Sequence, residues 1–373
     1  MEALFWSAAT LILYTYAGYP LLIHWLARRR PAPASPEPPS AWPSVAIVMA
    51  AYNERARLPQ KLESLWNLDY PREKIRIYCV SDGSTDGTNE YLLGHKAVHA
   101  IILPRRSGKP SALNAALEQV TEEVVVFTDA RQILAPDAVR NLVSRLMQPG
   151  VGAVSGELLH RPPNTATAKH VGLYWLYEKW IRKNESRYHS VPGVSGALYA
   201  IRRDDYAPLA PDTILDDFEV PMAILRSGRR VLLEPTARAY DELPDDPSHE
   251  WARKTRTLAG NFQSFSRNSW LFSPKANPIF FQFISHKVLR LLMPYALLIT
   301  LVTSSVAPGV FYTGIFALQL FFYSGSILGW LHPATRRFRL VSFATVFVEL
   351  NLAAVAGLVR HLSGRTDVRW DKT

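Results

Sequence analysis

Cysteine is almost absent from this sequence. The 373 residues include one cysteine, Cys79, which excludes an internal disulfide framework and favours a reducing compartment. Because Cys79 lies within an apolar run, we expect a buried and unreactive thiol. No internal repeat is evident, and the length allows one large globular domain with additional elements.

Acidic residues are fewer than basic ones. The sequence has 32 Asp and Glu against 42 Lys and Arg, which gives a formal net charge of +10. Such an excess predicts an anionic partner: nucleic acid, nucleotide phosphates or the acidic face of a membrane. Long apolar stretches at both ends of the chain argue against nucleic acid, so we expect no nucleic-acid partner.

Charged residues are missing from Leu4–Leu26, which has the roughly 20-residue length that a bilayer-spanning helix needs. Three arginines follow at residues 28–30 and are expected to stay cytoplasmic. A cleaved signal peptide is the alternative, but its positive charges would precede the apolar core. We therefore expect a transmembrane anchor over residues 1–30, followed by an extended proline-rich linker over residues 31–43.

Three more apolar stretches occur within the C-terminal region, residues 271–373. We expect transmembrane helices there, preceded by an interfacial helix over residues 277–294. Four full spans would put the C-terminus outside, whereas its basic tail favours the inside. The sequence leaves both arrangements open. The expected spans are Leu291–Val310, Phe311–Leu331 and Val341–Leu358.

The middle of the chain, residues 44–270, alternates short β-rich runs with segments of helical spacing. This order predicts an α/β domain with a mostly parallel sheet and helices on both faces. We expect strands at Val45–Ala50, Ile75–Val80, Val98–Leu103, Glu123–Thr128 and Val151–Ser155, and helices at Arg57–Leu68, Thr88–Leu93, Pro110–Val120, Pro136–Met147 and Val220–Arg226.

Polar clusters follow the first four expected strands. Singly, each suits a helix cap or a loop, as Asp86 and Thr88 illustrate. Ligands of such sheets bind beyond the carboxyl ends of the strands, and acids beside basic residues there suit a metal–diphosphate group. The clusters contain Asn53 and Glu54, then Asp82 and Asp86, then Arg105, Arg106, Lys109 and Asn114, and then Asp129, Arg131 and Gln132.

Eight segments in order make the sequence similar to membrane-anchored family 2 glycosyltransferases, which include cellulose, hyaluronan and poly-N-acetylglucosamine synthases. The resemblance implies a GT-A fold, a nucleotide-sugar donor, a divalent cation (Mg²⁺ or Mn²⁺) and inversion at the anomeric carbon. The segments are AIVMAAYNE, IYCVSDGSTDGT, SGKPSALNAAL, VVVFTDARQIL, VGAVSG, GVSGALYAIRR, LDDFEVPMAI and RKTRTLAGNFQ.

The resemblance also implies roles for single residues. Asp129 matches the first acid of the metal-binding D-x-D motif, whose second acid is here Arg131. Either Asp129 alone holds the cation with diphosphate oxygens and water, or Arg131 supplies charge in its place. The implied nucleotide-sugar site consists of Ala51, Tyr52, Asn53, Glu54, Asp82, Lys109, Asn114, Asp129, Arg131, Arg253 and Arg256.

The acidic pair Asp216–Asp217 matches the catalytic motif of the family, with Asp217 as the expected base. The alternative is a pair of acids that only stabilises a helix N-terminus. The matching acceptor loop contains Ser195, Gly196 and Ala197. The family tryptophan after the second motif arginine is replaced by Thr257, which leaves processive polymerisation open.

These features predict an inverting, membrane-bound hexosyltransferase at the cytoplasmic face of a bacterial inner membrane. We expect a UDP-sugar donor, a glycan or lipid-linked acceptor, contact with membrane lipids, and a role in surface polysaccharide synthesis, with export partners as an option. The alternatives are a processive synthase that secretes its product and, from another class, a nucleotide-binding membrane scaffold.

Overall fold

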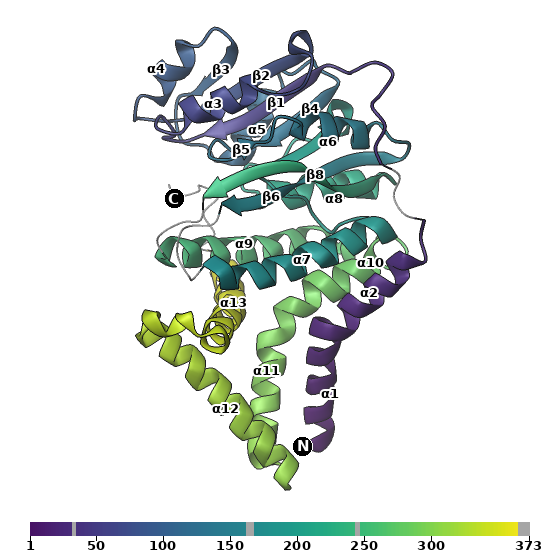
Figure 1. Cartoon of the computed structure of the whole chain (residues 1–373), viewed down its shortest axis with the longest axis vertical. Coiled ribbons are helices and arrows are strands. Elements are labelled where there is room, and N and C mark those ends of the chain that lie inside the picture. The colour runs from purple at the N-terminus through teal and green to yellow at the C-terminus, as the bar shows by residue number, and fades with distance from the viewer. Residues whose placement is uncertain (32–34, 162–167, 243–246, 365–373) are drawn as a thin grey trace.

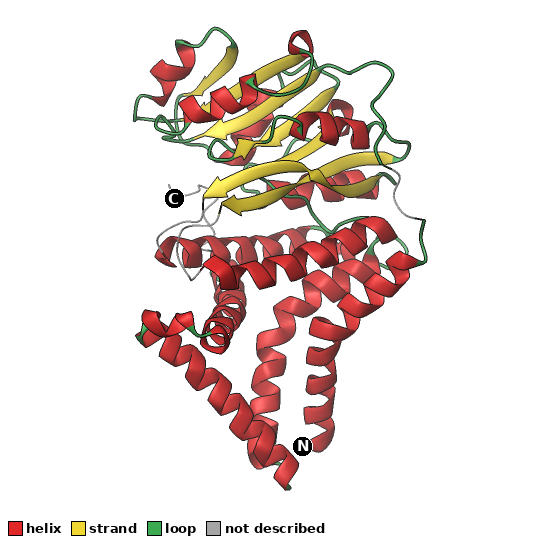
Figure 2. Ribbon diagram, in the orientation of Figure 1, coloured by secondary structure: helices red, strands yellow, loops and turns green. Residues whose placement is uncertain are grey.

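The computed structural model describes residues 1–31, 35–161, 168–242 and 247–364. The strands lie in one half of the molecule, and the other half is purely helical (Figures 1 and 2). Two long helices, α7 (Ala168–Tyr188) and α9 (Pro247–Arg267), lie between the two halves.

The sheet domain contains an eight-stranded sheet in the order β3-β2-β1-β4-β7-β6-β8-β5. The pairs β1–β2, β2–β3, β1–β4 and β6–β8 are parallel, whereas β7 is antiparallel to β4 and β6, and β5 to β8. The sheet is thus mixed, which corrects the expectation of a mostly parallel one. The strands are β1 (Val45–Ala51), β2 (Ile75–Asp82), β3 (Val98–Leu103), β4 (Val124–Thr128), β5 (Ile133–Leu134), β6 (Val151–Arg161), β7 (Leu198–Arg202) and β8 (Arg230–Glu242).

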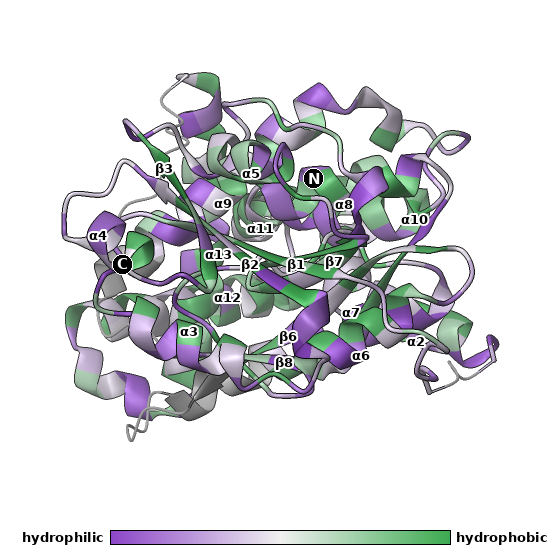
Figure 3. Ribbon diagram, turned by 90° about the horizontal axis from the view of Figure 1, so that it is seen from above, coloured by the Kyte–Doolittle hydropathy of each residue, from purple (hydrophilic) through white to green (hydrophobic). Residues whose placement is uncertain are grey.

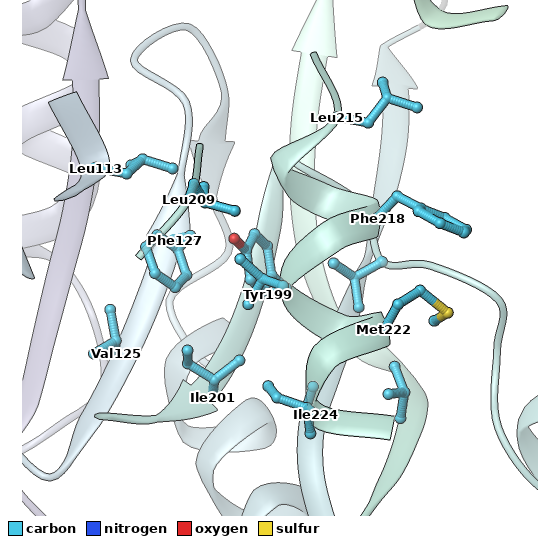
Figure 4. Packing of buried hydrophobic residues seen from close by; sticks show 14 of the residues in the cluster. Leu113, Val125, Phe127, Tyr199, Ile201, Leu209, Leu215, Phe218, Met222 and Ile224 are labelled. Atoms are coloured by element: carbon cyan, nitrogen blue, oxygen red, sulfur yellow. The ribbon is translucent and has the colours of Figure 1, made fainter. Parts of the chain in front are cut away.

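Apolar side chains on alternate positions of the strands build one core on each face of the sheet. Val45, Ile47 and Met49 join the core with α3 and α6, and Ala46 and Val48 join the core with α5 and α8. Figure 3 shows the apolar strands enclosed between these layers, and Figure 4 shows the core beneath α8. The covering helices are α3 (Leu58–Trp66), α4 (Thr88–Leu93), α5 (Lys109–Leu117), α6 (Ala138–Leu146) and α8 (Asp216–Arg226).

The N-terminal segment is helical, with α1 (Glu2–Leu13) and α2 (Tyr19–Arg28) joined by the π-helical turn Tyr14–Gly18. Helix α1 packs along α11, and α2 packs along α7. Among the described residues, however, no N-terminal helix is long and apolar enough to cross a membrane. The expectation of a membrane-spanning helix at the N-terminus is therefore not supported by length and composition.

The C-terminal region has three helices that are long and apolar enough to cross a membrane: Phe280–Val306, Val310–Leu331 and Arg339–Leu362. The first contains α10 (Phe280–Gln282), the π-helical turn Phe283–Val288 and α11 (Leu289–Val306), so the segment expected at the interface continues directly into the span. The other two are α12 (Val310–Leu331) and α13 (Arg339–Leu362). Many of their large apolar side chains are exposed, as a lipid-facing surface requires.

Helix α11 runs away from the sheet domain, α12 returns toward it, and α13 lies along α9 (Figure 1). The approach of α13 to α9 is close, because a Cβ atom on Gly357 would lie 2.9 Å from the backbone nitrogen of Ala259. At the other end of this contact, Lys254 forms a 3.7 Å ion pair with Glu349. The acid that is unusual for an apolar helix is thus matched by a base of α9.

Candidate active site

The carboxyl ends of β1, β2 and β4 meet at one edge of the sheet, because these strands are neighbours and parallel. Asn53 follows β1, Asp82 ends β2, and Asp129 follows β4. The structure therefore brings the predicted donor side to a single edge, as the order of the strands implies.

The loop after β1 is tied to the loop after β2. Asn53 has a φ of 55°, the only positive φ of a non-glycine residue in the described parts of the chain. Its backbone N–H donates to Ser84 Oγ at 3.0 Å, and its Oδ1 accepts the N–H of Thr85 at 2.8 Å. Asparagine tolerates this left-handed conformation, which turns the chain sharply at the strand end.

Other predicted donor residues lie in the same loops. Ala51 is buried, and the Arg106 guanidinium lies 4.1 Å above the ring of Tyr52. Glu54 pairs with Arg57 at 3.2 Å, and its own N–H donates to Thr88 Oγ1. Their contacts with a nucleotide stay predictions.

Asp82 is fully buried and holds the loop that follows β3. Its two carboxylate oxygens accept the backbone N–H groups of Ser107 at 2.6 Å and Gly108 at 2.9 Å. The Asp86 carboxylate likewise accepts the N–H and hydroxyl of Thr88, at 3.1 and 2.6 Å. Both aspartates therefore shape loops, and direct contact of Asp82 with a nucleoside stays a prediction.

Lys109 is the centre of the acidic cluster. Its Nζ lies 3.0 Å from Asp129 Oδ1 and 3.1 Å from Asp216 Oδ2, and its side chain is only 19% exposed. Burial alone would lower the pKa of Lys109, but the carboxylates of Asp129 and Asp216 outweigh it and raise that pKa. A permanently charged ammonium therefore joins the end of β4 to the start of α8.

Asp217 lies beside the predicted acceptor loop. A Cβ atom on Gly196 would lie 3.1 Å from Asp217 Oδ2, so a larger residue at this position would crowd the Asp217 carboxylate. The N–H of Val194 donates to the Asp217 carbonyl at 3.0 Å. On either side of Gly196, Ser195 N–H donates to Ser155 Oγ and the Ala197 carbonyl accepts from Thr128 Oγ1.

Burial raises the pKa of Asp217 from 3.8 to about 6, and the neighbouring charge of Asp216 adds to the rise. The charge of Lys109 opposes the rise. A carboxylate with a pKa near 6 is mostly ionised at pH 7 and accepts a proton more readily than an ordinary aspartate. Asp217 thus has the basicity expected of the predicted base, and the catalytic role itself stays a prediction.

Arg131, which replaces the second acid of the D-x-D motif, is directed to β8. Its guanidinium forms a 2.8 Å ion pair with Asp241, whose carboxylate also accepts from Gln132 Nε2 at 3.0 Å. Arg131 therefore contributes a positive charge that is partly neutralised by Asp241.

The metal-ligand set at this edge is small. Within the described residues, no group of three or more His, Cys, Asp or Glu side chains could hold a metal ion. Asp129, 38% exposed, supplies one carboxylate, of which Oδ1 faces Lys109. Hard dications accept phosphate oxygens and water as further ligands, so the residues present fit a cation that binds together with a diphosphate.

Two further groups of predicted donor residues lie on α5 and α9. Asn114 fastens a loop to α5, since its Oδ1 accepts from Tyr206 Oη and its Nδ2 donates to the Leu209 carbonyl, both at 2.8 Å. Arg253 and Arg256 are partly buried on α9. Their contacts with a donor stay predictions.

Helix α9 also positions the acidic pair. A Cβ atom on Gly260 would lie 2.6 Å from the Leu215 side chain, and Gln263 Oε1 accepts the N–H of Ile214 at 3.0 Å. These contacts hold the two residues that directly precede Asp216. The segment carrying the catalytic motif is therefore fixed between α9 and the sheet.

Lys61 is a site-adjacent residue that sequence reasoning missed. It is fully buried, and its Nζ donates to Thr128 Oγ1 at 2.8 Å and to the Gln132 carbonyl at 2.7 Å, on both sides of Asp129. Burial lowers its pKa to about 7, while Asp129 opposes that shift. A lysine among the apolar positions of α3 was the sequence feature that could have predicted a buried, functional side chain.

The family model described as glycosyl transferase family 2 matches residues 46–209, from β1 past β7. The chain is similar to an N-acetylglucosaminyltransferase of Mesorhizobium japonicum, with 28% identity over 68% of this chain and 67% of that protein. It is also similar to a poly-β-1,6-N-acetyl-D-glucosamine synthase of Staphylococcus epidermidis, with 25% identity over 61% of this chain and 56% of that protein. The matches thus span between about half and two thirds of these relatives.

Among solved structures, the chain is similar to a mannosyltransferase from Pyrobaculum calidifontis in complex with GDP-mannose and Mn²⁺. The TM-score is 0.73 at 26% identity, and the match covers 97% of this chain and 99% of the other. The family match, the glycosyltransferases among its relatives and this shared GT-A-like fold show that the chain contains a family 2 glycosyltransferase domain.

Proposed function

We propose that the enzyme transfers a hexose, with inversion, from a nucleotide sugar to a glycan or lipid-linked acceptor. The observation that carries this proposal is the convergence of Asp129, Asp216 and Asp217 around Lys109, beside the loop that contains Gly196. The proposed donor residues and the proposed acceptor loop thus both lie near the Asp217 carboxylate, whose raised pKa suits it to accept a proton.

Asp217 would act as the base. As the acceptor hydroxyl attacks the anomeric carbon, its proton passes to the Asp217 carboxylate and a new C–O bond forms. The C–O bond to the diphosphate breaks on the opposite face, and the diphosphate leaves with the electron pair. Lys109 keeps Asp217 ionised near neutral pH, and Arg253 and Arg256 would bind the departing diphosphate.

A divalent cation, Mg²⁺ or Mn²⁺, would be held by Asp129 together with the donor. It would supply charge that neutralises the diphosphate. The mannosyltransferase of similar fold is solved with Mn²⁺, which supports this assignment. Treatment with EDTA should abolish transfer and readdition of Mn²⁺ should restore it, whereas an unchanged rate would assign the charge to Arg131 instead.

The first candidate donor is UDP-N-acetylglucosamine, because the curated relatives include N-acetylglucosaminyltransferases. GDP-mannose is the second, because the mannosyltransferase covering nearly the whole chain is solved with it. A screen of nucleotide sugars for release of the nucleotide, with and without membrane lipid extracts, decides between them. Release from none of them by the full chain would contradict the proposed function.

We place the enzyme in a bacterial inner membrane, with the sheet domain cytoplasmic, as a step in surface polysaccharide synthesis. The three apolar helices and the synthase among the relatives support this placement. Thr257 is exposed on α9 where the synthase motif has tryptophan, so we propose limited addition, or polymerisation together with export partners. The length of the product made from one nucleotide sugar tests this choice against a processive synthase.

A further inference from the structure

Two basic side chains approach Asp217 from the side of the apolar helices. Arg182 belongs to α7, and Lys287 belongs to the π-helical turn Phe283–Val288 at the start of the first membrane-length helix. Neither takes part in the donor cluster around Lys109 described above.

Arg182 is attached to the acceptor loop. Its Nη2 donates to Ser155 Oγ at 3.2 Å and to the Gly193 carbonyl at 3.4 Å. The same Ser155 hydroxyl accepts the N–H of Ser195 at 3.0 Å. The guanidinium is therefore hydrogen-bonded to the loop beside Asp217, and its hydrogen bonds within the described residues go to uncharged oxygens.

Lys287 is partly buried, yet its ammonium has no hydrogen bond or ion pair with any part of the chain that the structure describes. Its charge lowers the pKa of Asp217, after the larger effects of burial, Asp216 and Lys109, so the ammonium lies within electrostatic reach of that carboxylate. Removing a cation from water without an ionic partner costs free energy, and binding of an anion from outside the chain would offset that cost.

The nearby acids of α7 have other partners. Glu178 binds Arg290 and accepts from His286 Nε2 at 3.1 Å. Glu185 accepts from the Tyr19 hydroxyl at 2.5 Å and from His286 Nδ1 at 2.8 Å. The carboxylates of Glu178 and Glu185 thus bind groups of α11, of His286 and of the N-terminal helix. Neither carboxylate is hydrogen-bonded to Arg182 or Lys287 in the described part of the chain.

We propose that Arg182 and Lys287 bind a phosphate ester at the head of a lipid acceptor, an inference that rests on the proposed function. Arginine and lysine are the side chains that suit phosphate oxygens. The carrier is a lipid because Lys287 lies at the sheet-domain end of a membrane-length helix whose Leu292 and Leu298 are 44% and 58% exposed. A bound lipid-linked acceptor would place its phosphate at Arg182 and Lys287, the hydroxyl of its glycan beside Asp217, and its lipid chain along α11.

The test uses the full chain purified in a neutral detergent, with farnesyl phosphate, farnesol and inorganic phosphate as probes in titration calorimetry. Lys287→Met removes one cation that makes no bond in the protein, so the variant should fold. Lys287→Arg restores the charge. Lys275→Met is the matched control, because Lys275 is an exposed lysine of the same boundary region.

We expect farnesyl phosphate to bind at least about tenfold more tightly than farnesol or inorganic phosphate, since both the charge and the chain contribute. Lys287→Met should lose about tenfold in this affinity, as for the loss of a hydrogen bond between charged groups. Lys287→Arg and Lys275→Met should bind as the wild type does.

Equal binding of farnesyl phosphate and farnesol, or an unchanged Lys287→Met, would overturn the proposal. Binding of inorganic phosphate as tightly as farnesyl phosphate would refute the lipid source. Nucleotide release from the donor, measured on the same preparation, separates this result from the proposed function. If the enzyme releases nucleotide from the donor but does not bind farnesyl phosphate, the lipid-phosphate site is refuted and the proposed function is not.

Discussion

Lys109→Met tests whether one ammonium holds the acidic cluster together. Lys109 is 19% exposed and pairs with Asp216, which is 8% exposed, and with Asp129, which is 38% exposed. Removing one partner of a buried pair costs about 3–5 kcal/mol. Because water screens Asp129, we assign the cost to the Asp216 pair alone, about 3 kcal/mol. For a domain of this size that corresponds to a fall in Tm of roughly 6–12 °C.

The same variant should shift the pH dependence of the reaction. In the wild type, the acidic limb of kcat/KM should lie near pH 6, because the Asp217 base is protonated below its pKa. Lys109 opposes the rise of that pKa, so its removal should move the limb to higher pH. Lys96→Met, which removes an exposed lysine, is the control.

Thermal unfolding followed by fluorescence in detergent gives Tm, and initial rates of nucleotide release between pH 5 and pH 9 give the profile. Lys109 is also a proposed donor ligand, so the position of the limb, not the absolute rate, carries the test. A Tm and an acidic limb that both match the wild type would refute the central role of Lys109.

Two further predictions concern the donor side and the membrane. Asp82→Ala should weaken UDP binding, because the loop after β3 loses the carboxylate that orders it; calorimetry with UDP and Mn²⁺ that gives an unchanged affinity would contradict this role. The path of α11, α12 and α13 predicts that the end of α13 lies on the side of the sheet domain. Since Cys79 is buried, Ser363→Cys should react with a maleimide added from the cytoplasmic side and Val310→Cys with one added from the other side. The reverse pattern would refute this topology.

Much of the sheet domain was predictable because local patterns specify it. The bounds of β3 and α4 match the expected residues, and β1 and β2 extend beyond them by one and two residues. Strands β5, β7 and β8 were not predicted, and the sheet is mixed because β7 is inserted antiparallel between β4 and β6. A sequence pattern indicates a strand, whereas the neighbour of that strand depends on the path of the chain.

The candidate site was predictable as a set of residues and not as a set of contacts. Lys109, Asp129 and Asp216 were all named from motifs, yet their convergence joins positions far apart in the chain. The pairing of Arg131 with Asp241 had no signal in either local segment. Such long-range pairs exist only after the fold has formed.

The N-terminal segment shows the limit of reasoning from missing charges. Leu4–Leu26 has no Asp, Glu, Lys or Arg, yet among the described residues only C-terminal helices are long and apolar enough to cross a membrane. The contact of α13 with α9 places α13 next to the sheet domain, which counting apolar residues could not predict.

The central claim is that Asp217 is the base of sugar transfer, and Asp217→Asn tests it most directly. Asparagine keeps the size of the side chain but cannot take a proton, and a positioned general base contributes about 10²–10⁴-fold. With the identified donor and acceptor, the account predicts a loss of transfer by about that factor with UDP affinity unchanged, and a clearly smaller loss for Asp216→Asn. Transfer by Asp217→Asn at the wild-type rate would contradict the account.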